Sequence, residues 1–320
     1  KPARSLKPFG IKQRGAITTE QASAVLSELY QSTRPYFFFL HYIDVHHPYG
    51  SPAPHEGKLT SDFPELKGEH KGEEKLGNMI AMPQLQYVQG QLNHELKKIQ
   101  QEGKDVAQHY KQIYLENLLY LDSELEKIRK MVVDSERPTL WIITSDHGEH
   151  FSENNAMLHG NHMFQDSIRV PFILSGPLIS KNIRRKGIPD LADIAPTILE
   201  YAGIDVPQTM TGRSLLGEND LAEKLHVVCD DARLMLRMGN FKLIANRTES
   251  SFQPTAIYNL AIDPKENENL LGKDPIENKL IEVLENELLR DTFSESKGPR
   301  SAEQEAALNA LGYVEMHGEH

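Results

Sequence analysis

The amino-acid sequence predicts an α/β fold, with a mixed, largely parallel sheet flanked by helices and a small antiparallel subdomain at the C-terminal end. Up to about residue 217, short apolar runs alternate with longer segments whose apolar residues recur at helical spacing. This alternation is typical of buried parallel strands joined by covering helices. After residue 217, short strand candidates follow one another with turns between them, which indicates an antiparallel sheet. We expect an α/β domain over residues 1–217 and a C-terminal subdomain over residues 218–320.

The first part of the chain predicts a helix, a strand, a loop and a long helix. A capping-box pattern that begins at Thr18 predicts a helix over residues 18–30. The apolar run over residues 36–42 predicts a buried strand, and the Pro- and His-rich residues 44–54 predict a loop. Apolar residues at helical spacing predict a long helix over residues 105–132.

The second part predicts two more buried strands, at residues 139–144 and 170–174. A short helix is expected over residues 191–202, because Asp193 can cap its start and Gly203 its end. In the C-terminal subdomain we expect a helix at residues 275–290 and four strands, at residues 225–229, 234–238, 241–245 and 256–260.

Composition excludes some classes of protein. The formal net charge of −11 over 320 residues argues against a nucleic-acid partner, which requires a basic surface. No run approaches the roughly 18 apolar residues of a membrane helix. Because Cys229 is the single cysteine, an internal disulfide is excluded.

The stretch 139–150 carries the strongest functional signal. Its apolar run ends in Asp146, His147 and Gly148, and a carboxylate and an imidazole can both bind a divalent cation. Adjacent strand residues point to opposite faces, so both can reach one ion only if the chain turns at the glycine. The alternative is a strand-end acid that caps a helix, beside a surface histidine.

Histidines accumulate around this stretch. Together with His147 and His150, His159 and His162 place four of the fourteen histidines within sixteen residues. His46 and its neighbour follow the predicted strand at 36–42, and ligands gather beyond the carboxyl ends of strands in α/β sheets. We therefore expect the 44–47 loop and the 146–147 pair to meet at one sheet edge. The alternative for each histidine is a solvated loop residue.

Several motifs, in order, resemble the sulfatase branch of the alkaline phosphatase superfamily. The resemblance covers about residues 16–314. The motifs that carry it are Asp44-Val-His-His-Pro-Tyr49, Ser145-Asp-His-Gly-Glu149, His159-Gly160 with Phe164–Pro171, Asp193–Leu199 with Thr211–Leu216, and Asp263-Pro264 with Asn269-Leu270.

The resemblance implies a role for each matching residue. Asp146 and His147 would bind one divalent metal ion. His46 and His159 would contact the ester and assist the leaving group, while Arg169 and Glu149 are candidates for structural support of the site. Ca²⁺ is the metal that the family implies, but a histidine ligand fits Mn²⁺ or Zn²⁺ at least as well.

No segment of the sequence matches the motif that carries the family's nucleophile. Sulfatases use a formylglycine in a Cys/Ser-x-Pro/Ala-x-Arg motif, which would precede all the motifs above. The segment Cys229–Arg233 lacks the Pro/Ala and lies too far along the chain. We therefore expect formylglycine upstream of Lys1, an α/β domain without its N-terminal part, and a missing segment or companion chain that covers the sheet. The chain alone is expected to be inactive.

The resemblance thus implies a metal-dependent hydrolase of sulfate monoesters, acting on a small-molecule or saccharide sulfate ester in the periplasm or outside the cell. One alternative is a phosphonate monoester or phosphodiester hydrolase of the same superfamily. Another is a non-catalytic fragment or binding chain that lacks the nucleophile, and a third is a transferase of phosphate-linked groups.

Overall fold

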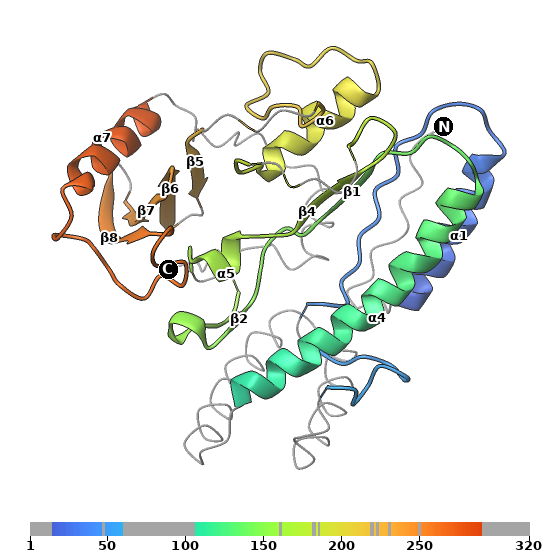
Figure 1. The fold of residues 1–320 in the computed structure, drawn as a ribbon, viewed down its shortest axis with the longest axis horizontal. Helices are drawn as coiled ribbons and strands as arrows, with labels where there is room; N and C mark the ends of the chain where they lie inside the picture. The colour runs from blue at the N-terminus through green and yellow to red at the C-terminus, as the bar shows by residue number, and fades with distance from the viewer. Residues whose placement is uncertain are drawn as a thin grey trace, which may run out of the picture. The chain divides into compact units, whose positions relative to one another are not determined.

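A computed structural model describes residues 15–46, 49–59, 106–159, 162–180, 184, 186–217, 221, 224–229, 232–248 and 251–289 (Figure 1). These residues form two compact units, one that extends to Arg137 and one that begins at Pro138. Among them, no helix is both long and apolar enough to cross a bilayer.

The first unit is built on two helices, α1 (Gly15–Tyr30) and α4 (Val106–Asp134), which lie side by side (Figure 1). Both helices were predicted, but α1 begins at Gly15 rather than at the expected cap Thr18. The Gly15 amide donates to Asp44 Oδ1 at 2.8 Å, so a distant loop satisfies the first turn of the helix. The local capping-box prediction was therefore wrong.

Residues 36–42 form an extended segment but no strand, which corrects the prediction of a buried strand. Their exposure alternates. Tyr36 lies under the Arg137 guanidinium at 4.9 Å, and Tyr42 bonds to Thr19 at 2.9 Å, whereas Phe37 and Phe39 on the other face are 71% and 78% exposed. A strand requires a partner for its backbone groups, and no described residue provides one.

The second unit begins with a strand pair. β1 (Trp141–Thr144) pairs with β4 (Phe172–Ser175). Both strands were predicted, but as buried strands, whereas β1 is half-buried and alternate residues of β4 are exposed. The pair is antiparallel, with Trp141 opposite Ser175. All strand pairs in the described part of the chain are antiparallel, so the parallel part of the expected sheet is not among them.

Short elements connect these two strands and follow them. Between them are β2 (His150–Phe151), η3 (Glu153–Asn155), β3 (Met157–Leu158) and α5 (Gln165–Ile168); after them come η4 (Leu191–Asp193) and α6 (Ile194–Tyr201). The predicted helix at 191–202 thus begins as a 3-10 turn. Its cap is Asp190, whose side chain accepts from the Ala192 amide at 3.1 Å, and not Asp193, which is fully buried.

A four-stranded antiparallel sheet forms the C-terminal part, as the sequence predicts. Its strands are β5 (His226–Cys229), β6 (Arg233–Met238), β7 (Phe241–Arg247) and β8 (Phe252–Asn259), in that order, and α7 (Ile276–Leu289) follows. The turn at Gly239, with φ of 57°, joins β6 to β7.

Both faces of this sheet are covered. Alternate residues of β6, β7 and β8 point to opposite faces, so Leu236, Leu243 and Ile257 share one face and pack against α7. The other face, which includes Met235 and Ile244, packs against residues 163–168. The sheet is therefore in contact with α5, which borders the candidate site.

Candidate active site

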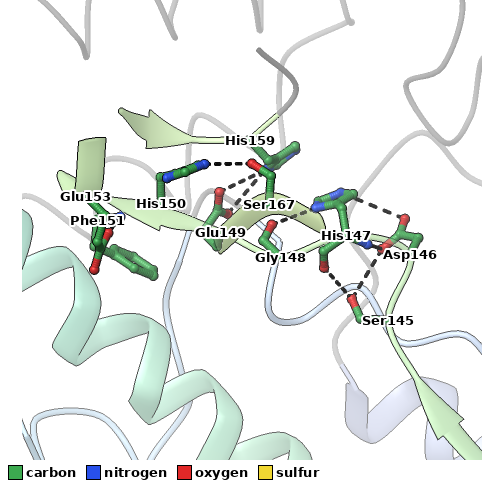
Figure 2. A network of polar contacts seen from close by, with 10 residues as sticks. All are labelled: Ser145, Asp146, His147, Gly148, Glu149, His150, Phe151, Glu153, His159 and Ser167. Atoms are coloured by element: carbon green, nitrogen blue, oxygen red, sulfur yellow. Dashed lines mark hydrogen bonds and ion pairs between the residues drawn. The ribbon is translucent and has the colours of Figure 1, made fainter. Parts of the chain in front are cut away.

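The turn after β1 places Asp146 and His147 at the end of the strand (Figure 2). Thr144 Oγ1 donates to the Pro171 carbonyl at 2.8 Å and thereby holds the strand end against the segment before β4. Ser145 Oγ donates to the His147 carbonyl at 2.7 Å, and the His147 amide donates to Asp146 Oδ1 at 3.0 Å. These bonds fold residues 145–147 back on themselves.

Gly148 is required by a close approach of the backbone. Its amide donates to the Ser167 carbonyl at 2.7 Å, which ties the turn to α5. A Cβ atom at this position would lie 2.0 Å from the Asp166 carbonyl oxygen. The sequence predicts a turn that depends on glycine here. The structure shows why: the Asp166 carbonyl leaves no space for a side chain at position 148.

Asp146 and His147 have the geometry of two ligands of one ion. His147 Nδ1 lies 2.8 Å from the Gly148 carbonyl, which can only accept, so Nδ1 carries the proton and Nε2 carries the lone pair. Nε2 lies 3.8 Å from Asp146 Oδ2. Two ligands at about 2.1 Å from one ion lie at most about 4.2 Å apart, so the pair fits a divalent cation.

The pair is also open to solvent, with side-chain exposures of 57% for Asp146 and 31% for His147. Within the described ranges, no group of three or more His, Cys, Asp or Glu side chains could hold one metal ion. The described part of the chain thus offers two candidate ligands, Asp146 and His147.

His159 lies against this pair. Its ring stacks on that of His147, with centroids 4.1 Å apart and planes at 26°. Its Nδ1 lies 3.0 and 3.2 Å from the two carboxylate oxygens of Glu149, a residue whose side chain is 5% exposed (Figure 2). A buried carboxylate that accepts from Nδ1 fixes both the tautomer and the orientation of the ring.

A second pair of histidines, His150 and His162, is linked to the turn through Ser167. His150 is fully buried, and its Nε2 lies 2.7 Å from Ser167 Oγ. His162 lies 5.6 Å from the His150 ring and stacks on Phe164 at 5.7 Å. Burial lowers the pKa of both histidines, so they stay neutral near pH 7. His162, a candidate site residue in the sequence, is part of this packed cluster.

His46 belongs to the first unit. Its amide donates to the Ile43 carbonyl at 3.1 Å within a turn. Asn117 of α4 spans this loop, since its Nδ2 donates to the Asp44 carbonyl at 2.8 Å and its Oδ1 accepts from the Gly50 amide at 3.2 Å. Helix α4 therefore fixes the two ends of the loop that carries His46.

The meeting of His46 with Asp146 and His147 at one edge stays a prediction. His47 and Gly160, which the sequence also singled out, lie outside the described residues. The role of Ser167 and the burial of His150 were not expected, since the sequence marks His150 only as one of four clustered histidines. Glu149 lies between His147 and His150 in the sequence. This position was the signal that could have identified it as the partner of His159.

Comparison with known proteins agrees with the motifs. The family model Sulfatase matches residues 11–204, which is more than half of the chain, and the model N-sulphoglucosamine sulphohydrolase, C-terminal, matches residues 155–293. Arylsulfatase K of Mus musculus is 28% identical over 268 residues, which cover 76% of this chain and 48% of that protein. The chain spans about half the length of the curated relatives it matches.

Solved structures share the fold. The structure of BT4656 in complex with its substrate D-glucosamine-2-N,6-O-disulfate aligns with a TM-score of 0.60 at 18% identity, covering 90% of this chain and 72% of that one. The phosphonate monoester hydrolase SpPMH from Silicibacter pomeroyi aligns with a TM-score of 0.63 at 17% identity, covering 87% and 60%. The predicted α/β class is thereby confirmed, and the chain belongs to the sulfatase family of the alkaline phosphatase superfamily.

Proposed function

We propose that the complete protein hydrolyses sulfate monoesters at the end of β1. The observation that carries this proposal is the arrangement of three side chains. Asp146 Oδ2 and His147 Nε2 lie 3.8 Å apart, and the His159 ring stacks on His147. Metal ligands of this kind, next to a histidine held by a buried carboxylate, suit the hydrolysis of an anionic ester.

Asp146 and His147 would hold the divalent cation. When bound, the cation supplies Lewis-acid polarisation of the ester oxygens. His159 would move a proton to the leaving oxygen through Nε2, because its Nδ1 is committed to Glu149. His46 would bind an ester oxygen from its own loop. Formylglycine remains the expected nucleophile, on a missing segment or companion chain, and no residue of this chain is assigned that role.

The identity of the metal is part of the proposal. Family resemblance favours Ca²⁺, which prefers oxygen ligands. The imidazole nitrogen of His147 instead favours Mn²⁺ or Zn²⁺. Metal content of the purified protein, measured by mass spectrometry, distinguishes the three.

A sulfated saccharide is the proposed substrate class. Two similarities support it: the match to the C-terminal model of N-sulphoglucosamine sulphohydrolase, and the fold shared with BT4656, whose solved complex contains a sulfated glucosamine. Such a substrate fits the proposed location in the periplasm or outside the cell.

Phosphonate monoester or phosphodiester hydrolysis is the second candidate. The nitrogen ligand of His147 and the fold shared with SpPMH favour it. A non-catalytic binding chain is the third candidate, because the sequence lacks a matching nucleophile motif.

One experiment separates these candidates. The protein is produced from its complete coding sequence and assayed with an aryl sulfate, an aryl phosphonate and a bis-aryl phosphate. The proposal expects the highest kcat/KM on the aryl sulfate, with activity abolished in Asp146→Ala and His46→Ala. A higher kcat/KM on the phosphorus esters would favour the second candidate. No turnover of any ester would favour the third.

A further inference from the structure

Besides the packing of its sheet on residues 163–168, the C-terminal subdomain contacts α5 through a buried carboxylate, Glu266. Its Oε1 accepts from Lys242 Nζ at 2.5 Å, and both side chains are buried, with exposures of 1% and 0%. Its Oε2 accepts from the Gln165 amide, also at 2.5 Å, across 101 residues of sequence. Gln165 is the first residue of α5, where a helix leaves its backbone N–H groups without internal partners.

Helix α5 in turn holds the turn that carries the candidate metal ligands. The Ser167 carbonyl accepts from the Gly148 amide at 2.7 Å, and Ser167 Oγ bonds to His150 Nε2 at 2.7 Å. The Asp166 carbonyl fills the space where a Cβ of Gly148 would lie. A displacement of α5 would therefore displace the turn directly after Asp146 and His147.

We propose that Glu266 is a positioning residue for this metal-binding turn. It would fix the N-terminus of α5, and α5 would fix Gly148 and the two ligands before it. The inference rests on the proposed function, since it assumes that Asp146 and His147 bind a metal. The C-terminal subdomain would thereby contribute to the affinity of the site for metal.

Two features indicate that Glu266 occupies its position at an energetic cost. Its backbone has a φ of 56°, in the left-handed region that residues other than glycine rarely adopt. Burial also lowers the pKa of Lys242 to about 8, against the opposing effect of Glu266. A buried ion pair is often no more stable than an apolar pair of the same size. An apolar residue, however, could not accept the Gln165 N–H.

This difference gives the test. Two double variants of the complete protein remove both buried charges, Lys242→Met with Glu266→Gln and Lys242→Met with Glu266→Leu. They differ in whether residue 266 retains an acceptor for the Gln165 amide. Circular dichroism melting verifies that each one folds. Isothermal titration with Mn²⁺ and with Ca²⁺ gives the metal dissociation constants.

The proposal expects the Leu variant to bind metal at least about tenfold more weakly than the Gln variant, the scale typical when support of a metal ligand is lost. It also expects faster amide hydrogen exchange over residues 145–151 in the Leu variant. Glu268→Gln is the matched control: it neutralises an exposed carboxylate in the same loop and should leave metal affinity unchanged.

Equal metal affinity and equal exchange in the two double variants would overturn the role of Glu266. If the wild-type protein binds no divalent metal, the proposed metal site fails. The exchange comparison then decides on its own whether Glu266 positions the turn. The two failures are thus distinguishable.

Discussion

Gly148→Ala is expected to damage the candidate site through a contact of a single added carbon. That carbon would lie 2.0 Å from the Asp166 carbonyl oxygen, and contacts under 3.0 Å essentially never occur, so α5 or the turn has to move by about 1 Å. Overpacking costs about 1–3 kcal/mol. Loss of the Gly148–Ser167 hydrogen bond adds about 0.5–1.5 kcal/mol. The free energy of unfolding should therefore fall by about 1.5–4.5 kcal/mol.

For a unit of this size the loss corresponds to a fall in Tm of roughly 3–18 °C. A ligand displaced by about 1 Å should also lower kcat/KM on an aryl sulfate by about 100-fold. Differential scanning calorimetry and steady-state kinetics on the complete protein measure the two effects.

Gly239→Asn is the matched control, because it replaces a glycine of the same unit at a turn with open space around it. Asparagine tolerates the φ of 57° there, so the Tm of the Gly239→Asn protein should lie close to that of the wild type. A Gly148→Ala protein that melts within about 2 °C of wild type and retains its kcat/KM would refute the reasoning, since α5 and the turn would then yield without cost.

Glu149, Asn117 and His150 each give a further prediction. Glu149→Gln should lower kcat/KM on the aryl sulfate by about 10–100-fold, because the ring of His159 loses its charged partner; unchanged kinetics would contradict this. Asn117→Ala should reduce the free energy of unfolding in urea by about 1–3 kcal/mol and lower kcat, since the loop of His46 loses its two hydrogen bonds to Asn117; Asn117→Asp should not restore stability, because it places a buried carboxylate oxygen against the Asp44 carbonyl. Burial lowers the pKa of His150, so the unfolded state takes up its proton first and stability should fall as pH drops below about 6.5; this slope should be smaller in His150→Gln.

Local signals explain which parts of the fold were predictable. β5, β6 and β7 each contain a short apolar run, and the turn at Gly239 is local to the two strands that it joins; β8 begins four residues before the predicted strand at 256–260, because its first half is largely polar. The position of Asp146 and His147 after β1 was predictable for the same reason, since a strand and the turn after it are neighbours in the chain.

Long-range contacts explain what was not predictable. Asp44 caps α1 across 29 residues, so the capping-box pattern at Thr18 gave the wrong start. Glu266 lies in a stretch rich in Lys and Glu, which is typical of a solvated loop, yet it is buried through contacts 24 and 101 residues away. The extended segment 36–42 has the composition of a buried strand, but burial depends on what covers both of its faces.

The packing of residues 163–168 on the C-terminal sheet determines how this chain can be divided in the laboratory. A cut after residue 217 would separate Met163 and Phe164 from Met235, Ile244 and their neighbours, exposing apolar side chains on both products. A chimera that exchanges this sheet between relatives would have to exchange residues 163–168 with it. Residues 163–168 and the C-terminal sheet would therefore have to come from the same parent protein, although they lie far apart in the sequence.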